Sequence, residues 1–419
     1  MDKVRVVLTA LIIRLLFAPF FAHIWDVNTI QVSLYYFYQH GINIYEYVYN
    51  VSMWLQTSTN LPLYYEGYAY LPHYLLMNVP LYSLYLTLGG DPLPIKNVFD
   101  PSHPLKVAFS PDVHIFLLII KLPIILSDAI IVWLLYKINR KLAWIYALSP
   151  YSVFISAVWG MFDSLIALLL LVTILLLRDR RFFEAGIAYS LSLIKLYTAY
   201  AFPVVIAEVW RGGKAKGFIR FVLGALVAQT LTIYFFTKNP TAFLSTTLLF
   251  HGERSGGGIT PLNILWLIFN IEFNVAFSKL VSAILVGVWS VITLYVVKKG
   301  VSIEKAIAIS MITGLFLGKL VNEQYLLSVY PLLLIITSET HKLEKYPLIF
   351  ALLNSTPIYF ALPLLASFPS YQSILMLWHK IIVSEEIFFL RHVTLFIIGT
   401  LMLFRMVDLL IALLSKPRG

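Results

Sequence analysis

The sequence predicts an all-α, polytopic membrane protein: a transmembrane helical bundle of about 12 spans. Of its 419 residues, 60% are hydrophobic and only 12% are charged, whereas about a quarter of the residues in soluble domains are charged. So few charges cannot cover the two or three domains that a soluble chain of this length would form. The composition therefore excludes an ordinary soluble enzyme, a disordered chain and a small secreted scaffold.

The basic residues support the same fold class. The net charge is +10, but the lysines and arginines lie in short clusters between apolar runs and form no single stripe. That distribution orients helices by the positive-inside rule and argues against a nucleic-acid partner. The clusters are Lys137–Lys141, Arg178–Arg181, Arg211–Arg220, Lys298–Lys299, Lys342–Lys345 and Lys416–Arg418. We expect an integral, multi-pass membrane protein with both termini cytoplasmic.

Twelve crossings follow when the apolar runs are placed between these clusters. Residues 183–209 begin and end at basic clusters, so they must go out and return as two short half-spans joined near Lys195–Tyr197. We expect residues 1–413 to form a single module and residues 414–419 to be a cytoplasmic tail. The remaining spans are 4–22, 114–136, 142–158, 162–177, 217–236, 277–297, 304–320, 324–337, 346–366 and 387–413.

Two long outer loops interrupt the spans. Residues 23–113, rich in Tyr, Trp, Pro and Asn, form a large extracytoplasmic loop, and residues 237–276 form a second outer loop. Residues 70–88 and 261–272 inside them are also apolar. Counting either as a full span would place basic clusters on the wrong side, so we predict that both are interfacial or re-entrant helices.

Asp26 is the first candidate for chemistry, because it directly follows the first span, in HIWDVN at 23–28. A partly buried carboxylate at the water–lipid boundary can act as a general base toward a hydroxyl. A solvated, inert carboxylate at a helix end fits the same pattern. Asp26 and Asn28 form a D-x-N that could supply oxygen ligands, but that pattern alone is weak evidence for a metal. We therefore predict no metal and no cofactor.

Lys195 is the stronger signal. A lysine within an apolar stretch costs roughly 2.5–3.5 kcal/mol at the bilayer centre on insertion scales. The ammonium either extends to the surface or binds an anion, and a phosphate is the anion that we expect. His251 and Arg254 precede Gly256–Gly258, where glycine N–H groups and an arginine fork suit phosphate. A plain mobile loop has the same composition.

Other polar residues lie at outer span ends. Asp163 is at the turn between two spans, in WGMFDS at 159–164, and Glu323, Gln324 and Tyr325 begin the span that follows residues 319–321. An interface anchor explains the second group equally well. Only a bundle that packs these span ends side by side would bring the candidates together.

Six segments, in order, resemble a known family. They are Asp26 after the first span, GINIY at 41–45 with YAYLP at 68–72, KLPIILSDAIIVWLLYK at 121–137, ALSPYSVFISAVWGMFDSL at 147–165, LIKLYTAYAFP at 193–203 and NEQYLLSVYPLL at 322–333. This order is similar to the type-C glycosyltransferase superfamily, and most like the catalytic subunit of GPI mannosyltransferase I and related dolichyl-phosphate-sugar-dependent transferases. The resemblance covers roughly residues 1–335. Asn28 replaces the second Asp of a D-x-D, and Ser149 replaces the Asn of an Asn-Pro.

The resemblance implies a role for each matching residue. Asp26 would be the catalytic carboxylate, and Lys195, His251 and Arg254 would face the donor phosphate. The substrate cavity would be bordered by Asn28, Tyr70, Asp163, Tyr197, Glu323, Gln324 and Tyr325.

The expected function is inverting transfer of mannose from a dolichyl or polyprenyl phosphate to a glycolipid or glycan acceptor on the extracytoplasmic or luminal side. One carboxylate base without a partner nucleophile implies inversion. The expected partners are the sugar lipid, the acceptor, the bilayer and an accessory membrane subunit. A glucosyltransferase, a transporter or lipid flippase, and a non-catalytic subunit of a glycosylation complex remain alternatives.

Overall fold

The computed structural model describes residues 2–59, 68–96, 107–250, 257–259, 275–316, 320–337, 343–354, 357–368, 370–382 and 384–415. It is about 82% helical, which confirms the all-α class. The strands in these residues are short. β1 (Ile95–Lys96) pairs antiparallel with β2 (Ala108–Phe109), and β3 (Gly257–Gly258) pairs in parallel with β4 (Leu320–Val321).

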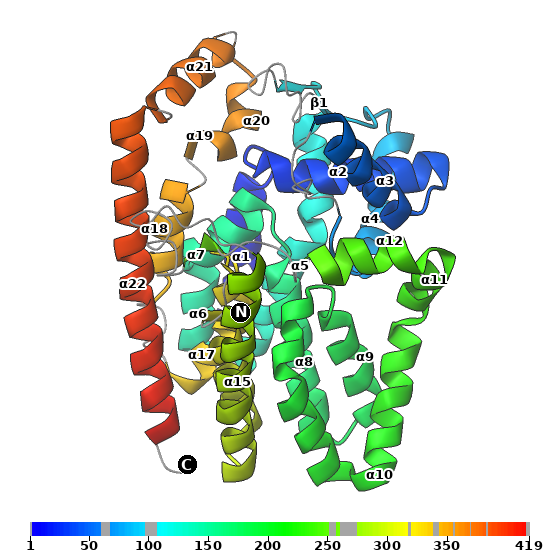
Figure 1. The fold of residues 1–419 in the computed structure, drawn as a ribbon, viewed down its shortest axis with the longest axis vertical. Coiled ribbons are helices and arrows are strands. Elements are labelled where there is room, and N and C mark those ends of the chain that lie inside the picture. The colour runs from blue at the N-terminus through cyan, green and yellow to red at the C-terminus, as the bar shows by residue number, and fades with distance from the viewer. Residues whose placement is uncertain are drawn as a thin grey trace.

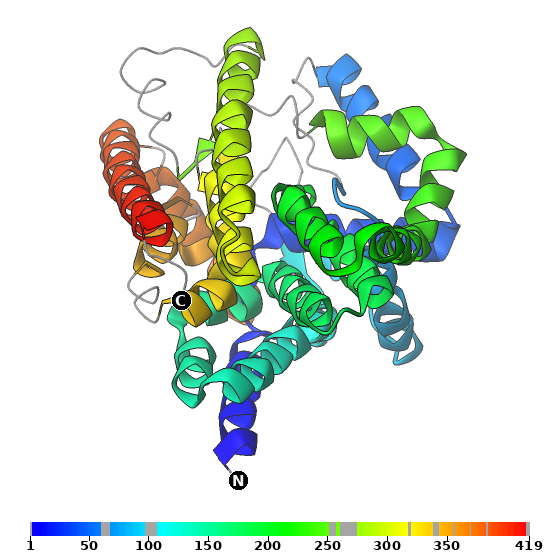
Figure 2. The ribbon, with the colours of Figure 1, turned by 90° about the horizontal axis from the view of Figure 1, so that it is seen from below.

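The helices form a bundle with a helical layer at one end of it. α8 (Asp163–Arg178), α9 (Phe182–Ser192), α10 (Phe202–Ala228) and α22 (Glu385–Ser415) run along the long axis of the molecule (Figure 1). Seen from below, α1 extends to the side, with the N-terminus at its tip (Figure 2). The other bundle helices are α1 (Asp2–Phe17), α5 (Val113–Ile138), α6 (Arg140–Leu148), α7 (Pro150–Val153), η1 (Phe154–Trp159), η2 (Leu196–Ala201), α11 (Thr230–Lys238), α15 (Val275–Lys299), α16 (Ile303–Phe316), α17 (Tyr325–Ile336) and α18 (Lys345–Asn354).

Within the described residues, the helices support part of the predicted span count. Three described helices are long and apolar enough to cross a bilayer: Val113–Ile138, Ser282–Lys299 and Phe389–Ser415. Two bent pairs raise the number to five: Arg140–Leu148 with Pro150–Trp159, and Leu196–Ala228 with Thr230–Lys238. The chain therefore has helices suited to a membrane, but twelve crossings are not confirmed.

Short helices account for the difference. A helix needs about 20 residues to cross a hydrocarbon core about 30 Å thick. α1, α8, α16 and α17 have 16, 16, 14 and 12 residues. The expected span 346–366 is divided into α18, α19 (Pro357–Phe360) and α20 (Leu362–Leu365). Hydropathy alone does not show that this apolar run is divided among three short helices.

Capping residues set one of the bends. α6 ends at Ser149, whose side-chain oxygen accepts a hydrogen bond from Ser152 N, and Pro150 occupies the first turn of α7. Proline is favoured there, because it has no N–H to leave unsatisfied and its φ is already helical. The two helices meet at 51°. The Ser149–Pro150 pair thus breaks what the hydropathy presents as one span.

The predicted break near Lys195 is present within residues 183–209, while the placement of the two segments as half-spans stays a prediction. α9 ends at Ser192, Lys195 is extended (φ −103°, ψ 112°), and the 3-10 helix η2 leads into α10. α9 then packs closely on the second half of α10. A Cβ at Gly186 would lie 2.0 Å from Phe221 O, and one at Gly224 would lie 1.9 Å from Phe183 O, so only glycine allows this approach.

The described residues within 23–113 are mostly helical. The layer at the upper right of Figure 1 contains α2 (Ile24–His40), α3 (Ile44–Thr59), α4 (His73–Thr87) and α12 (Pro240–Leu244). η3 (Ser245–Leu249) continues α12, and α21 (Tyr371–Ile382) lies at the upper left. α4 occupies most of the stretch 70–88 for which a helix is predicted. The stretch 261–272 lies outside the described residues.

Several helix ends that the sequence places on the inner side meet in the structure. Arg178 pairs with Glu304, Lys299 Nζ donates to Leu414 O at 2.7 Å, and Arg211 donates to Val297 O. Figure 1 shows the kink of α10, the end of α15 and the C-terminus together at the lower end. These pairings bring three basic clusters together, as the positive-inside rule requires; the orientation in the membrane remains a prediction.

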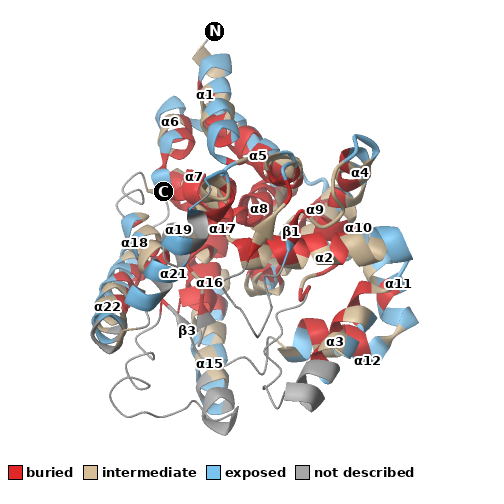
Figure 3. Ribbon diagram, turned by 90° about the horizontal axis from the view of Figure 1, so that it is seen from above, coloured by how far each residue is buried: buried red, intermediate tan, exposed pale blue. Residues whose placement is uncertain are grey.

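The core lies where α5, α7, α8, α16 and α17 meet, as the concentration of buried residues in Figure 3 shows. Every residue of α16 except Lys305 is buried. By contrast, only 11% of the Ser282–Lys299 window is buried. The central helices therefore position polar side chains by tight packing, while α15 presents most of its apolar surface outward.

Candidate functional site

The turn at residues 159–164 is the structural centre of the candidate site. η1 ends at Gly160, which is left-handed (φ 90°) and favours glycine for that reason. A Cβ there would also lie 2.7 Å from Lys121 Cε. Three residues later α8 begins with Asp163, so the carboxylate lies at the positive end of the helix dipole.

Asp163 forms a buried triad with Lys195 and Tyr197. Lys195 Nζ lies 2.6 Å from Asp163 Oδ2, and the Tyr197 hydroxyl donates to Asp163 Oδ1 at 2.5 Å. The Asp163 side chain is 0% exposed and that of Lys195 is 3% exposed. Lys195 thus does not extend to the surface, and the triad joins the start of α8 to the break between α9 and α10.

Aromatic rings surround the Lys195 ammonium. Its nitrogen lies 4.7 Å from the Phe162 ring centroid, 5.7 Å from that of Tyr70 and 6.0 Å from that of Tyr197. Tyr325, at the start of α17, packs on Tyr197 with ring centroids 4.7 Å apart. Rings in this position attract a cation through their electron-rich faces and keep the ion pair away from lipid.

Asp26, in the first turn of α2, contacts the same turn at residues 159–164. Trp159 Nε1 donates to Asp26 Oδ2 at 2.6 Å, and His23 Nδ1 lies 2.5 Å from that oxygen. Oδ1 receives no hydrogen bond from the residues that the structure describes. The Asp26 side chain is 22% exposed, so it neither points freely into water nor is sealed in the core.

The surroundings of Asp26 favour its charged form. Burial raises the pKa of the carboxyl, but the charge of His23, hydrogen bonds from His23 and Trp159, and the charge of Lys195 together outweigh this effect. The pKa of Asp26 therefore lies below its ordinary value. Asp26 and Lys195 are thus within electrostatic range of each other, although 169 residues separate them in the sequence.

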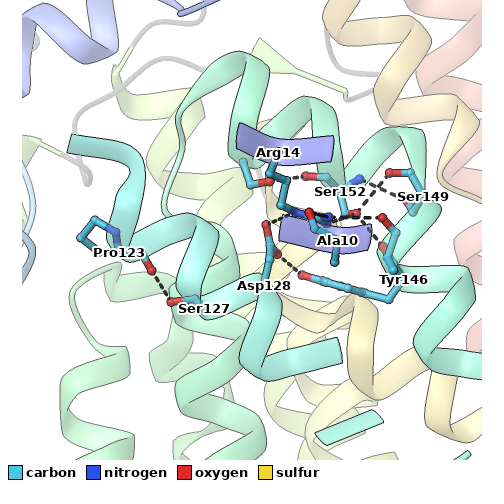
Figure 4. A network of polar contacts seen from close by, with 10 residues as sticks. Ala10, Arg14, Pro123, Ser127, Asp128, Tyr146, Ser149 and Ser152 are labelled. Atoms are coloured by element: carbon cyan, nitrogen blue, oxygen red, sulfur yellow. Dashed lines mark hydrogen bonds and ion pairs between the residues drawn. The ribbon is translucent and has the colours of Figure 1, made fainter. Parts of the chain in front are cut away.

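The described region holds two other buried cations, and each makes three or more hydrogen bonds. Lys121 donates to the carbonyls of Ala18, Phe21 and Ala157. Arg14 bonds Asp128 Oδ2 at 2.6 Å, the carbonyls of Ala10 and Ala147, and Ser152 Oγ; Figure 4 shows this network. Among the described residues, in contrast, Lys195 donates to Asp163 alone, and aromatic rings lie within 6.0 Å of its nitrogen.

The start of α17 borders this cluster. Glu323 and Gln324 are 4% and 5% exposed, and the Tyr151 hydroxyl donates to Glu323 O at 2.7 Å. Gln324 Oε1 is buried and has no hydrogen-bond partner among the described residues. Because a buried amide oxygen left unpaired is costly, it marks a place where a hydroxyl from a ligand would be stabilised.

The structure thus brings together Asp26, Tyr70, Asp163, Lys195, Tyr197 and Tyr325, with Gln324 and Glu323 adjacent. Asn28 has another role: Gln31 Nε2 donates to its Oδ1 at 3.2 Å, and Gln31 also bonds the backbone of Ile95. Asn28 therefore belongs to the contact between α2 and β1. His251 and Arg254 lie outside the described residues. Within those residues, no group of three or more His, Asp and Glu side chains is placed to hold a metal.

Sequence reasoning missed His23, Trp159 and Phe162, which complete the site. All three lie in the segments HIWDVN and WGMFDS that contain the two carboxylates. The position of His23 three residues before Asp26, at a helix start, is a usable signal, because residues i and i+3 share a helix face. The Trp159 contact has no signal in the sequence, since it joins residues 133 positions apart.

Comparison with known proteins gives no further guidance. No family model matches this sequence, and no curated protein is significantly similar to it. The functional argument therefore depends on the geometry of the site and on the motif resemblance.

The arrangement provides three chemical capabilities. Asp26 is a carboxylate that is ionised near neutral pH and has one open oxygen. Lys195 is a desolvated cation with unused donors. The rings of Tyr70, Phe162, Tyr197 and Tyr325 and the amide of Gln324 offer the mixture of aromatic and polar surface that suits a sugar.

Proposed function

We propose that this chain is a membrane glycosyltransferase. It transfers a hexose, mannose in our first hypothesis, from a polyprenyl-phosphate donor to a glycolipid or glycan acceptor on the extracytoplasmic face. The observation that carries the proposal is the open oxygen of Asp26 in electrostatic range of Lys195, a buried cation with unused donors. A base and an anion site in such proximity are what transfer from a phosphate leaving group requires.

The mechanism is a single displacement with inversion. Asp26 removes the proton of the acceptor hydroxyl as its oxygen bonds the anomeric carbon. The bond from that carbon to the phosphate oxygen breaks, and the electron pair leaves with the phosphate. Lys195 stabilises the charge that develops on the phosphate. With one base and no enzyme nucleophile, attack occurs opposite the leaving group.

The described residues supply too little positive charge for the donor by themselves. Lys195 and the charge of His23 do no more than balance the two negative charges of Asp26 and Asp163. A lipid phosphate adds further negative charge, so other cations must approach. Arg254 and His251 are our candidates from the sequence, and Arg254→Gln is expected to raise the KM for the donor more than it lowers kcat.

The direct test uses purified protein with radiolabelled mannosyl and glucosyl polyprenyl phosphates and membrane lipid extract. Label transfer to a lipid or glycan supports the proposal, and the donor that serves identifies the sugar. Asp26→Asn should abolish transfer while leaving donor binding. The matched control is Asp91→Asn: Asp91 is 27% exposed and pairs with Lys96 and Ser110, outside the site, so transfer should be retained.

Transport is the second candidate function, because one observation favours it. A buried ion pair lies at the break between α9 and α10, and transporters also bind substrate at broken helices. Flux or lipid scrambling in liposomes without any sugar lipid, lost in Lys195→Met, would support transport. Binding of the sugar lipid without transfer would instead indicate a non-catalytic subunit that requires a partner.

A further inference from the structure

The contacts of Asp26 are unequal at its two oxygens. Both the Trp159 N–H and the His23 imidazole approach Oδ2, at 2.6 and 2.5 Å. Oδ1 has no such contact among the described residues. A base that is held at one oxygen presents the other in a fixed direction, which preorganises it for proton transfer.

We propose that His23 is a positioning residue for Asp26: together with Trp159 it holds Oδ2, so that Oδ1 is the atom that receives the proton of the acceptor hydroxyl. This inference rests on the proposed function, and it adds that Oδ1 of Asp26 accepts the proton and that His23 positions the carboxylate. The proton moves from the hydroxyl to Oδ1 as the hydroxyl oxygen bonds the anomeric carbon and the phosphate departs with its electron pair. His23 takes no part in bond making.

The backbone and the surrounding rings hold the imidazole rigidly. His23 N donates to Trp159 O at 3.0 Å, and Ala22 N donates to Phe360 O at 2.9 Å. The imidazole centroid lies 5.0 Å from the Trp159 ring, 5.4 Å from the Phe360 ring and 5.6 Å from the Trp25 ring. With packing on three sides, His23 has little freedom to leave Asp26.

Few other charged groups act on His23 and Asp26. Lys195, between α9 and η2, attracts the Asp26 carboxylate and is itself paired with Asp163 of α8. On the side of α19, Tyr359 packs on Trp25 at 5.0 Å, and Arg391 of α22 acts on Tyr359. His23 and Lys195 are therefore the charges that favour ionised Asp26, and His23 is the nearer.

The sign of the pH effect follows. His23 lowers the pKa of Asp26, so Asp26 stays ionised, and active as a base, to lower pH. Removing His23 raises that pKa. The acid limb of the pH–rate profile then moves to higher pH, by on the order of one unit, the size of shift that a close opposite charge produces.

The first experiment measures kcat/KM against pH for His23→Phe, His23→Gln and a control. His23→Phe should move the acid limb upward and lower kcat with the acceptor KM unchanged. His23→Gln, which keeps a hydrogen-bond donor, should recover part of the loss. The control is His114→Phe, because His114 bonds Pro19 O at 2.9 Å and packs on Phe20 near the same corner without contacting Asp26. Equal acid limbs in His23→Phe and His114→Phe would overturn the inference.

The second experiment tests the contact independently of transfer. Trp159 fluorescence, isolated by difference against Trp159→Phe, should titrate with Asp26, and its midpoint should rise in His23→Phe. An unchanged midpoint overturns the positioning role even if the protein transfers sugar. If the midpoint rises but the protein transfers no sugar, the proposed function is overturned, and with it the role of Oδ1. The positioning of Asp26 by His23 is still supported in that case.

Discussion

Two buried triads in this protein have the same local chemistry and different surroundings. In each, an aspartate accepts from a cation at one oxygen and from a tyrosine at the other: Arg14 and Tyr146 on Asp128, at 2.6 Å each, and Lys195 and Tyr197 on Asp163, at 2.6 and 2.5 Å. The remaining donors of Arg14 bond two carbonyls and Ser152. Those of Lys195 face aromatic rings.

The difference shows how a structural ion pair can be told from a functional one. Burying a cation is costly, and saturating every donor reduces that cost as far as possible. Arg14 therefore fastens α1 to α5 and to the bend at Ser149 (Figure 4). An unsaturated buried cation keeps part of the cost until a ligand fills its donors, so Lys195 is the triad cation that is poised for binding.

The largest expected effect comes from replacing each triad by apolar residues of similar size. Lys195→Met with Asp163→Leu and Tyr197→Phe should fold, because removing all partners leaves no unpaired charge, but should lose sugar transfer by more than about 100-fold. Arg14→Met with Asp128→Leu and Tyr146→Phe should retain transfer. Comparable transfer rates in the two triple variants would remove the distinction between the triads.

Removing only the cation from the Arg14 triad should strongly lower the free energy of unfolding. Arg14→Gln leaves Asp128 buried without its cation and should lower the free energy of unfolding by about 3–5 kcal/mol. Thermal unfolding in detergent measures this loss. Arg5→Gln, on the exposed side of the same helix, should change stability by less than about 0.5 kcal/mol, and an equal loss there would contradict the structural role of the Arg14 triad.

Replacing the tyrosine of each triad should lower stability less and should also distinguish the two triads. Tyr146→Phe and Tyr197→Phe each remove a hydrogen bond to a buried carboxylate, which is expected to cost about 1.5–3 kcal/mol. Only Tyr197→Phe should also change the KM for the sugar lipid, because only its triad borders the proposed site. A matching change in KM for Tyr146→Phe would indicate that the two triads act together.

The smallest stability effect is expected at Gln324. Its Oε1 already lacks a partner, so Gln324→Met should be neutral or slightly stabilising. If the amide binds a sugar hydroxyl, the same variant should raise the KM for donor or acceptor. Loss of stability without any change in KM would place Gln324 in the protein framework and outside the binding site.

The sequence by itself determined the helical, membrane-suited character of the chain, because composition and hydropathy are sums over residues that packing does not change. It also located the break near Lys195 and the helix over most of 70–88. The twelve predicted spans are not confirmed, and hydropathy does not register the caps and bends at Ser149–Pro150 and Gln229 that divide apolar runs.

The tertiary structure alone decided which polar residues meet. Asp26 and Asn28 are neighbours in the sequence, yet Asp26 bonds Trp159 and Asn28 bonds Gln31, because alternate faces of a helix meet different partners. Arg14 gave no sign of its pairing with Asp128. Such pairings join residues more than a hundred positions apart, and only the packing of the helices brings their side chains within hydrogen-bonding distance.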